Sequence, residues 1–401
     1  MYSLLAGLSI IEASSFVASP SAGLYLAQFG AEVIRVDPIG GGPDFRRWPQ
    51  ASNGASLYWE NLNRAKKSIA IDLGRSEGRE LLQALAASTG QFLTNFPAGG
   101  FLAHETVSKC RADLITVRIM GTADGGPALD YTVNAAVGIP QITGPAELGD
   151  APVNHVLPAW DLLTGAYAAF AMLAAVQHRA TTGAGGEVRI PLQDVATGSV
   201  ANLGMLAEAL VTGHDRARLG NDVFGAFGRD FTTADGTRLM LMAITPRQWT
   251  GLVAVLGIGD AVTAIEAERG ISFAHDEGLR FTHRDVLFPL VEAAVAQQPS
   301  DVLVRELERN GCCYGTYRTL SQAALDPALV SANPMFGPAD NPSGEVYPAS
   351  GPFATLPDRD RAPLRSAPKL GADTDDVLIE KLGLSSTQVA SLHDRGIVAG
   401  C

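Results

Sequence analysis

Short apolar runs alternate with helix-like segments along the first half of the chain. The segments between the runs carry apolar residues at helical spacing, as in residues 21–29, which Gly30 closes, and residues 77–87. Strands joined by crossover helices produce this order, so the pattern predicts an α/β fold with a mostly parallel, doubly wound sheet. Its strands are expected at residues 8–11, 33–36, 68–73, 92–96, 114–119 and 188–192.

The pattern changes after His214. Phe231 and residues 239–242 flank a turn at Asp235-Gly236, which predicts antiparallel strands and a smaller α+β domain. Residues 334–368 are rich in proline and glycine and are expected to form an ordered but irregular crossing segment. Further helices are expected at residues 162–178, 194–210, 246–256, 284–297, 374–382 and 386–393.

The composition indicates a compact protein and limits its partners. A chain of 401 residues, 46% hydrophobic and 18% charged, suits a folded body of about two domains. The net charge of −12 argues against nucleic acid or a membrane surface as a partner, because both require clustered positive charge. One basic cluster departs from this balance and is either solvated surface or an anion-binding site; it contains Arg35, Arg46, Arg47, Arg64, Lys66 and Lys67.

The cysteines and the N-terminus favour a cytoplasmic protein. The four cysteines form no CxxC pair, and the adjacent Cys312 and Cys313 suit neither a secreted disulfide framework nor a zinc site. No charged segment precedes an apolar run at the N-terminus, and the longest apolar run, residues 166–176, is short of the ~20 residues of a spanning helix. We therefore expect neither export nor membrane insertion.

Motifs for nucleotides and metals are lacking. The glycine-rich stretches at residues 40–42 and 225–228 do not have GxGxxG spacing, and no GxxxxGK[ST] motif occurs. The seven histidines are scattered without paired ligand spacing, so no metal site is predicted.

Asp161 is the first candidate for chemistry. It follows Pro158-Ala159-Trp160 and precedes a long apolar helix, so its position alone favours an N-cap. The same position suits a nucleophile, because free N–H groups and the helix dipole favour an ionised carboxylate. Position cannot decide between the two.

Several segments together resemble the CaiB/BaiF (family III) CoA-transferases. They are LAGLSIIEASSFVASPSAGLYLAQFGAEVIRVDPIGGG, LNRAKKSIAIDLGRSEGRELL, LTNFPAGG, PAWDLLTGAYAAFAMLAAVQHRATTGAGGEV and APKLGADTDDVLIEKLG, in this order along nearly the whole chain. The resemblance implies that Asp161 is the nucleophile. It also implies a Rossmann-like large domain built from residues 1–205 and 328–401, a small domain at residues 206–327, and a homodimer of interlocked subunits.

The resemblance implies further site residues. CoA enters as part of an acyl-CoA substrate, and no permanently bound cofactor is expected. Arg46 and Arg47 could meet the 3′-phosphate or the pyrophosphate of CoA. The other expected CoA contacts are Val17, Ala18, Ile71, Asp72, Leu73, Gly74, Asn95, Phe96 and Tyr131.

Two departures from the family pattern narrow the activity. Ser15-Phe16-Val17 stands where many members carry a polar Gln or His, so the acyl pocket must differ. Family racemases use a histidine in a GHDxNY-like segment, whereas residues 129–134 read LDYTVN here. Without this histidine, no second acid/base group can deliver a proton to the opposite face of the α-carbon, so racemisation is not expected.

Three blocks, VNHVLPAWDLLTG, RLGNDVFGAFGRDF and LHDRGIVAG, most resemble members that move CoA between the C1 and C4 carboxyls of mesaconate within one molecule. Residues 220–228 are then a candidate lid, or an ordinary hairpin loop. The alternatives are an intermolecular CoA-transferase and, in another class, a non-catalytic Rossmann protein that binds a CoA ester or a nicotinamide; the missing GxGxxG disfavours the nicotinamide.

Overall fold

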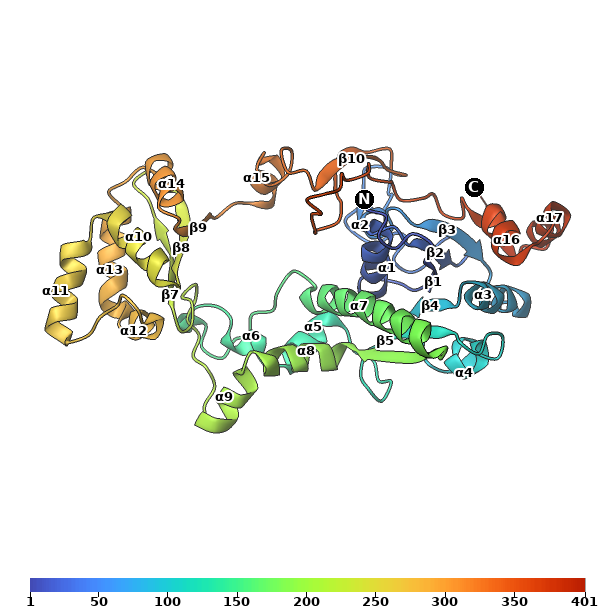
Figure 1. The fold of residues 1–401 in the computed structure, drawn as a ribbon, viewed down its shortest axis with the longest axis horizontal. Coiled ribbons are helices and arrows are strands. Elements are labelled where there is room, and N and C mark those ends of the chain that lie inside the picture. The colour runs from blue at the N-terminus through green and yellow to red at the C-terminus, as the bar shows by residue number, and fades with distance from the viewer. Residues whose placement is uncertain (401) are drawn as a thin grey trace. The chain divides into compact units, whose positions relative to one another are not determined.

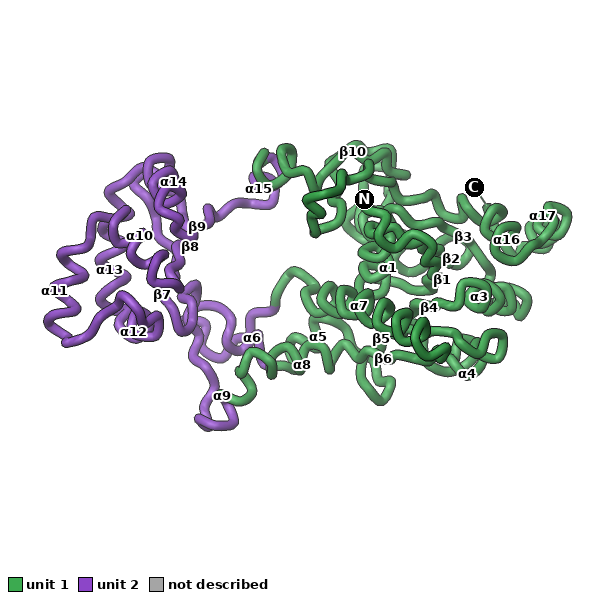
Figure 2. The backbone as a smooth tube through the Cα atoms, in the orientation of Figure 1, with its two compact units in different colours: residues 1–137, 155–208, 326–401 green, residues 138–154, 209–325 purple. Residues whose placement is uncertain are grey.

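The computed structural model describes residues 1–400, which form two compact units (Figure 2). Unit 1 comprises residues 1–137, 155–208 and 326–401, so it contains both ends of the chain. Unit 2 comprises residues 138–154 and 209–325. Residues 138–154 were predicted to belong to the large domain, and the predicted domain boundaries stay a prediction.

A seven-stranded sheet forms the centre of unit 1 (Figure 1). The strand order is β12-β3-β2-β1-β4-β5-β6, in which β1 to β6 run parallel and β12 is antiparallel to β3. This confirms the predicted α/β class with a mostly parallel sheet. The strands are β1 (Ser9–Ala13), β2 (Glu32–Asp37), β3 (Lys67–Ile71), β4 (Gln91–Thr94), β5 (Ile115–Met120), β6 (Gly186–Pro191) and β12 (Val398–Ala399).

Helices cover both faces of this sheet, because both faces are apolar. On β1, Ile10 packs with one core cluster and Ile11 with the other, as the alternation of a strand requires. The Ile10 cluster includes side chains of α1 (Ala18–Gln28) and α7 (Ala159–Thr182). The Ile11 cluster includes side chains of α3 (Ser76–Thr89), α16 (Thr374–Leu382) and α17 (Ser386–Asp394).

The longest helix, α7, passes a length-and-composition test for a membrane span. Among residues 1–400 only the α8–α9 pair also passes, and only if its two bent parts count as one span. Such helices are weak evidence for a membrane span, because core helices meet the same criterion; one side of α7, with Ala168 and Met172, is buried on the sheet.

The single helix predicted over residues 194–210 is wrong. It breaks at Gly204, whose φ is +76°, into α8 (Leu192–Asn202) and α9 (Met205–Thr212).

The crossing segment of unit 1 is more regular than predicted. Residues 334–368 contain an antiparallel hairpin of β10 (Phe336–Asp340) and β11 (Val346–Ser350). The amino group of Met1 donates to the carbonyl oxygen of Ala362 at 2.5 Å, which ties the segment to the start of the chain. The remaining elements of unit 1 are α2 (Leu57–Leu62), η1 (Gly100–Leu102), α4 (His104–Val107) and α5 (Asp130–Ala136).

Unit 2 has its own sheet and its own core. β7 (Phe227–Thr232), β8 (Arg238–Ala243) and β9 (Cys313–Thr316) form an antiparallel sheet in this order. Phe227, Trp249 and Phe288 lie at the centre of its core. The helices are α6 (Ile139–Ile142), η2 (Ala146–Leu148), α10 (Pro246–Leu256), α11 (Gly259–Arg269), α12 (Glu277–Thr282), α13 (Arg284–Val295), α14 (Ser300–Arg309) and α15 (Leu320–Leu325).

Candidate active site

The candidate site begins where the strand order of unit 1 reverses, between β1 and β4. Ligands of doubly wound sheets bind at the carboxyl ends of the strands at this point, because the two loops there diverge. A pair of hydrogen bonds joins these loops: the Ser15 N–H donates to Asn95 Oδ1 at 3.1 Å, and Asn95 Nδ2 donates to the Ser15 carbonyl at 2.8 Å. The predicted CoA residues after β1 and after β4 therefore lie side by side.

Phe16 has an uncommon backbone conformation in the first of these loops. Its φ is +67°, in the left-handed region that costs free energy for a residue with a side chain. The Phe16 N–H donates to Asp44 Oδ2 at 3.0 Å, and Asp44 in turn pairs with Arg35 on β2 at 3.1 Å. The buried carboxylate thus stabilises the turn that leads into α1.

Two of the six residues of the basic cluster are buried and pair with carboxylates. Arg35 is fully buried and pairs with Asp37 at 2.9 Å, and Lys66 pairs with Glu12 at 2.8 Å. Burial lowers the pKa of Lys66 to about 8. These cations hold the scaffold together, whereas Arg46 and Arg47 are exposed and available to a ligand.

Asp161 lies in the first turn of α7, and Pro158 is the N-cap of this helix. The N-cap interpretation of Asp161 is therefore wrong. A close approach of α7 to α1 places the turn beside the start of α1: a Cβ on Gly165 would lie 2.0 Å from Ser21 Oγ and 2.6 Å from the Ala18 carbonyl. Only glycine permits this approach.

The Asp161 carboxyl group is half-buried and, among residues 1–400, accepts no hydrogen bond and forms no ion pair. Burial, followed by the negative charge of Asp130, raises its pKa to about 7, while Arg47 acts in the opposite direction. The helix terminus was expected to keep this group ionised, but burial and Asp130 outweigh it.

Asp130 holds the start of α7 in place. It is 2% exposed, and its Oδ2 accepts the Asp161 N–H at 3.0 Å. Its Oδ1 lies 2.5 Å from His155 Nε2, and Trp160 Nε1 donates to Asn134 Oδ1 at 3.0 Å. Asp130 therefore acts on Asp161 twice, through the backbone and through its charge.

Arg47 lies between two aromatic side chains near Asp161. Its guanidinium carbon is 5.4 Å from the ring centre of Phe16 and 5.5 Å from that of Tyr58. Burial raises the pKa of Tyr58 to about 12, and the charges of Arg47 and Asp161 act on it in opposite directions. Arg47, Tyr58 and Asp161 thus share one electrostatic environment.

A mainly apolar pocket of about 420 Å³ lies at the ends of β3 and β4. Leu73, Phe96 and Phe101 line it, and the guanidinium of Arg79 is 5.1 Å from the Phe101 ring centre. Arg79 also donates to the carbonyls of Leu73 and Gly74 at 2.8 and 3.1 Å. The pocket brings together two of the predicted CoA residues, and Arg79 and Phe101 were missed by the sequence analysis.

The other predicted CoA residues differ in how they could meet a ligand. Val17, Ala18 and Ile71 are 6%, 5% and 0% exposed, so their side chains are not available to a ligand. Asp72 accepts the Gly74 N–H at 2.9 Å in the turn after β3. Tyr131 is 41% exposed and donates to the Val156 carbonyl at 3.1 Å.

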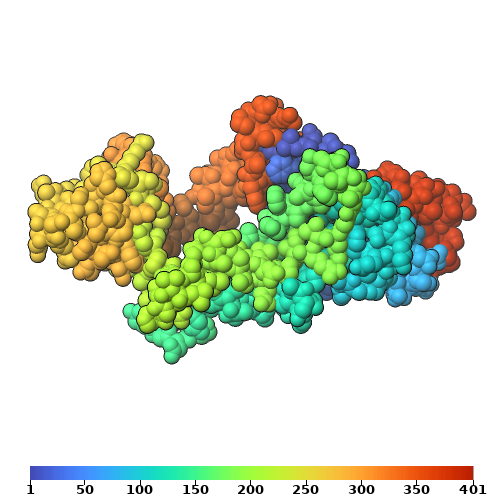
Figure 3. All heavy atoms as spheres, turned by 60° about the horizontal axis from the view of Figure 1, so that its bottom comes forward, coloured from blue at the N-terminus to red at the C-terminus, as the bar shows by residue number. Residues whose placement is uncertain are grey.

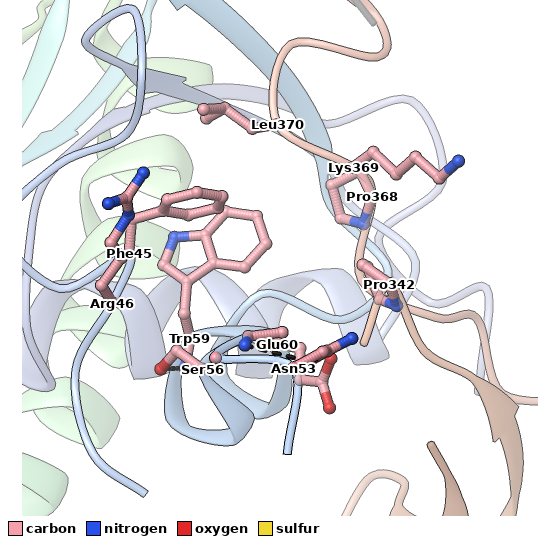
Figure 4. Close-up of a pocket in the computed structure, with 12 residues that line it drawn as sticks. Phe45, Arg46, Asn53, Ser56, Trp59, Glu60, Pro342, Pro368, Lys369 and Leu370 are labelled. Atoms are coloured by element: carbon pink, nitrogen blue, oxygen red, sulfur yellow. Dashed lines mark hydrogen bonds between the residues drawn. The ribbon is translucent and has the colours of Figure 1, made fainter. Parts of the chain in front are cut away.

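Arg46 does not share the surroundings of Arg47. It lines a separate pocket of about 560 Å³ with Lys369, Asn53 and the ring of Trp59 (Figure 4). The adjacent residues Arg46 and Arg47 therefore lie in different surroundings within unit 1.

Two residues of the site, Tyr58 and Asp130, were not predicted. Asp130 follows Leu129, where the family racemases have their histidine, and this position was its only signal in the sequence.

No group of three or more His, Cys, Asp or Glu side chains within residues 1–400 could hold a metal ion. The candidate lid leads into β7 of unit 2 and includes its first two residues, and its role stays a prediction.

Comparisons with known proteins agree with this geometry. The chain matches the model of CoA-transferase family III over residues 5–374. It is 44% identical to a 2-methylfumaryl-CoA isomerase of Chloroflexus aurantiacus, over 100% of this chain and 99% of that protein. It is 28% identical to a succinyl-CoA--D-citramalate CoA-transferase of the same organism, over 97% and 96% of the two chains.

A solved structure confirms the fold. The crystal structure of a CaiB/BaiF family protein from Brucella suis has a TM-score of 0.76 at 27% identity, and the match covers 95% of this chain and 100% of that one. The resemblance seen in the sequence is thereby confirmed. The chain is an enzyme that belongs to CoA-transferase family III and acts on CoA thioesters.

Proposed function

We propose that the enzyme moves CoA between the C1 and C4 carboxyl groups of mesaconate within one molecule, with Asp161 as the nucleophile. The observation that carries this proposal is the unpaired, half-buried Asp161 carboxyl in the first turn of α7, which lies against the start of α1. The full-length relative at 44% identity, a 2-methylfumaryl-CoA isomerase, supports the substrate.

The first half of the reaction transfers CoA to the enzyme. The Asp161 carboxylate attacks the C1 thioester carbonyl and expels the CoA thiolate, which leaves a mixed anhydride of Asp161 and mesaconate. The thiolate then attacks the aspartyl carbonyl, the anhydride C–O bond breaks, and the mesaconate carboxylate departs. A β-aspartyl-CoA thioester and a bound dicarboxylate remain. Covalent catalysis divides one difficult transfer into easier steps.

The second half repeats these steps in reverse through the other carboxyl group. The C4 carboxylate attacks the aspartyl thioester, thiolate leaves, and thiolate then attacks the C4 carbonyl of the new anhydride. Asp161 is released as a carboxylate, and no proton is gained or lost overall. The dicarboxylate must stay bound between the halves, which requires a site that retains it.

The surroundings of Asp161 suit this role. A carboxylate whose pKa is raised to about 7 is a stronger base than an ordinary aspartate, and nucleophilicity rises with basicity. Its ionised fraction falls below pH 7, so the reaction should slow in acid. The Asp161 carboxylate accepts no hydrogen bond from residues 1–400. Its attack on the thioester therefore breaks no hydrogen bond.

CoA would extend from Asp161 toward the pocket at the ends of β3 and β4. Phe96, Phe101 and Arg79 offer stacking surfaces for the adenine, which is planar and aromatic. Exposed Arg47, together with backbone N–H groups at the start of α1, would interact with the negatively charged groups of the substrate.

We also propose an interlocked homodimer in the cytoplasm. The outer side of α7 exposes Leu163, Tyr167 and Phe170, which are 43%, 52% and 64% exposed. The green segment that includes α7 is uncovered over much of its length in the space-filling view (Figure 3). A contiguous apolar surface of this kind is typical of protein interfaces.

The test follows CoA esters by chromatography, with mesaconyl-C1-CoA as substrate and no other acid present. The C4 ester should form with the unaltered enzyme, and Asp161→Ala should form none while still binding CoA esters. Asp194→Ala, which removes an exposed first-turn aspartate from α8, should behave like the unaltered enzyme. Full turnover by Asp161→Ala would exclude the nucleophile.

A second candidate is intermolecular transfer from a dicarboxyl-CoA donor to a free acid. Relatives at 28% and 29% identity, a succinyl-CoA--D-citramalate CoA-transferase and a succinate--glutarate CoA-transferase, favour it. The same assay separates the two, because this alternative gives no product until a free acid is added.

A further inference from the structure

Arg47 is an exposed cation without an anionic partner. Among residues 1–400 its guanidinium makes no hydrogen bond and no ion pair, although Phe16 and Tyr58 flank it at 5.4 and 5.5 Å. Arginines elsewhere in unit 1, such as Arg35 and Arg118, are saturated by carboxylates and carbonyls. The aromatic rings leave the in-plane N–H donors of Arg47 open to a ligand.

Tyr58 supplies a second unused donor beside it. Its hydroxyl oxygen is buried and has no hydrogen-bond partner within residues 1–400. A buried hydroxyl without a partner costs free energy, so its presence requires an explanation. A ligand oxygen would satisfy it.

The polypeptide holds these two donors together. Ser56, the N-cap of α2, donates its Oγ–H to the Arg47 carbonyl at 2.6 Å and accepts the Trp59 N–H at 3.0 Å. The cap thus joins the backbone of Arg47 to the helix that carries Tyr58. On the other side, Asp44 fixes the backbone of Phe16, so the arginine is flanked by two anchored rings.

The pair also lies near the nucleophile without contacting it. Arg47 lies over the ring of Phe16, just before α1, and the start of α1 lies against the beginning of α7, which carries Asp161. The charged atoms of Arg47 and Asp161 are nevertheless farther apart than an ion pair allows. A substrate with a carboxyl group at each end matches this arrangement of a nucleophile and a separate cation.

We propose that Arg47 and Tyr58 bind the carboxylate of the dicarboxylate that is not reacting at Asp161. A guanidinium and a hydroxyl together match the hydrogen-bonding pattern of a carboxylate. This assignment rests on the proposed function, since it names the residues that recognise its substrate as a dicarboxylate.

The assignment explains how the free acid is retained. Once the β-aspartyl-CoA thioester has formed, mesaconate has no covalent bond to the enzyme. One carboxylate remains bound by Arg47 and Tyr58 while the other faces Asp161, and the two exchange places before the second transfer. Loss of this site should slow the transfer and also release mesaconate.

The experiment supplies unlabelled mesaconyl-C1-CoA together with free ¹³C-mesaconate and measures the rate and the label in the CoA esters. The unaltered enzyme should incorporate almost no label. Tyr58→Phe and Arg47→Gln should lower the rate about 10- to 100-fold, as loss of a charged hydrogen bond does, and should incorporate label. Arg47→Lys should be intermediate, because lysine keeps the charge but loses the paired donors.

Matched controls separate this effect from a general loss of structure. Tyr317→Phe removes a hydroxyl from an exposed tyrosine, and Arg359→Gln removes an exposed arginine that has one weak ion pair. Both should match the unaltered enzyme in rate and label. Each variant is also tested for CoA binding and for its circular dichroism, so that an unfolded protein is recognised.

The outcomes distinguish the two proposals. Folded Arg47→Gln and Tyr58→Phe variants that keep the original rate and exclude label would overturn the carboxylate site but not the isomerisation. Rapid incorporation of label by the unaltered enzyme would overturn the isomerisation. The carboxylate site is then judged by the KM for free mesaconate, which Arg47→Gln should raise at least tenfold; an unchanged KM would refute it.

Discussion

Replacing Asp130 by asparagine should shift the pH dependence of the reaction toward acid. The amide keeps an oxygen that accepts the Asp161 N–H, now at 3.0 Å, but removes the negative charge. That charge is the second of two causes that raise the pKa of Asp161, and burial is the larger one. The variant therefore lowers this pKa and leaves the start of α7 in place.

The size of the shift follows from the pKa itself. The increase from 3.8 to about 7 corresponds to about 4 kcal/mol, at about 1.4 kcal/mol per unit. Since Asp130 is the smaller contributor, its removal is expected to lower the pKa by about one unit. At pH 6 the ionised fraction of Asp161 then rises about fivefold, whereas at pH 8 it hardly changes.

The assay measures kcat/KM for isomerisation between pH 5.5 and 9, where the acid limb reports the free enzyme. Other titratable groups near Asp161 are Arg47, Tyr58 and, through Asp130, His155. His155→Gln is therefore measured in parallel. An acid limb that stays in place in Asp130→Asn would refute the electrostatic argument, and a uniform loss at every pH would show that Asp130 acts through geometry alone.

Three further changes test the scaffold and the assembly. Gly165→Ala should destabilise the fold by about 1–3 kcal/mol in urea unfolding, because its Cβ would overlap Ser21 Oγ, and adding Ser21→Ala should recover part of the loss. Lys66→Met should cost about 3 kcal/mol, because it removes the shorter of the two ion pairs of the buried Glu12, at 2.8 Å, and leaves only the 3.5 Å pair with Arg35; Glu12→Gln in the same chain should restore part of the stability, and no recovery would contradict the pairing. Phe170→Glu should weaken the proposed dimer in sedimentation experiments, and an unchanged mass would place the interface elsewhere.

The regular part of the fold could be predicted because its signal is local. Strands β1 to β6 lie within two residues of their expected positions, since an apolar run bounded by polar turns marks each buried parallel strand. The hairpin β10–β11 was missed because Pro338 and Pro348 face each other in it, and proline ordinarily argues against a strand. The break at Gly204 was missed because one glycine in an apolar pattern is compatible with a continuous helix.

The candidate site could be predicted only where a motif marks it. Asp161 stands in a segment that resembles the family, whereas Arg47 stands in the basic cluster, and the roles of both remain proposals. No motif identifies Tyr58 and Asp130, because they belong to the site through interactions with residues far away in the chain, such as Asp161 and His155. Contacts of this kind arise from tertiary structure and leave no periodic signal.

The last strand of the sheet has a consequence for biosynthesis. β12 pairs with β3, so Val398 lies opposite Ile71 across more than three hundred intervening residues. On the ribosome, residues 1–137 emerge before unit 2 is translated. During that time the backbone N–H and C=O groups on the outer edge of β3 have no partner strand. Exposed strand edges promote aggregation, so a nascent chain that terminates before β12 should be a poor folder and a substrate for chaperones. Completion of the sheet is thus delayed until residues 398–399 have been translated.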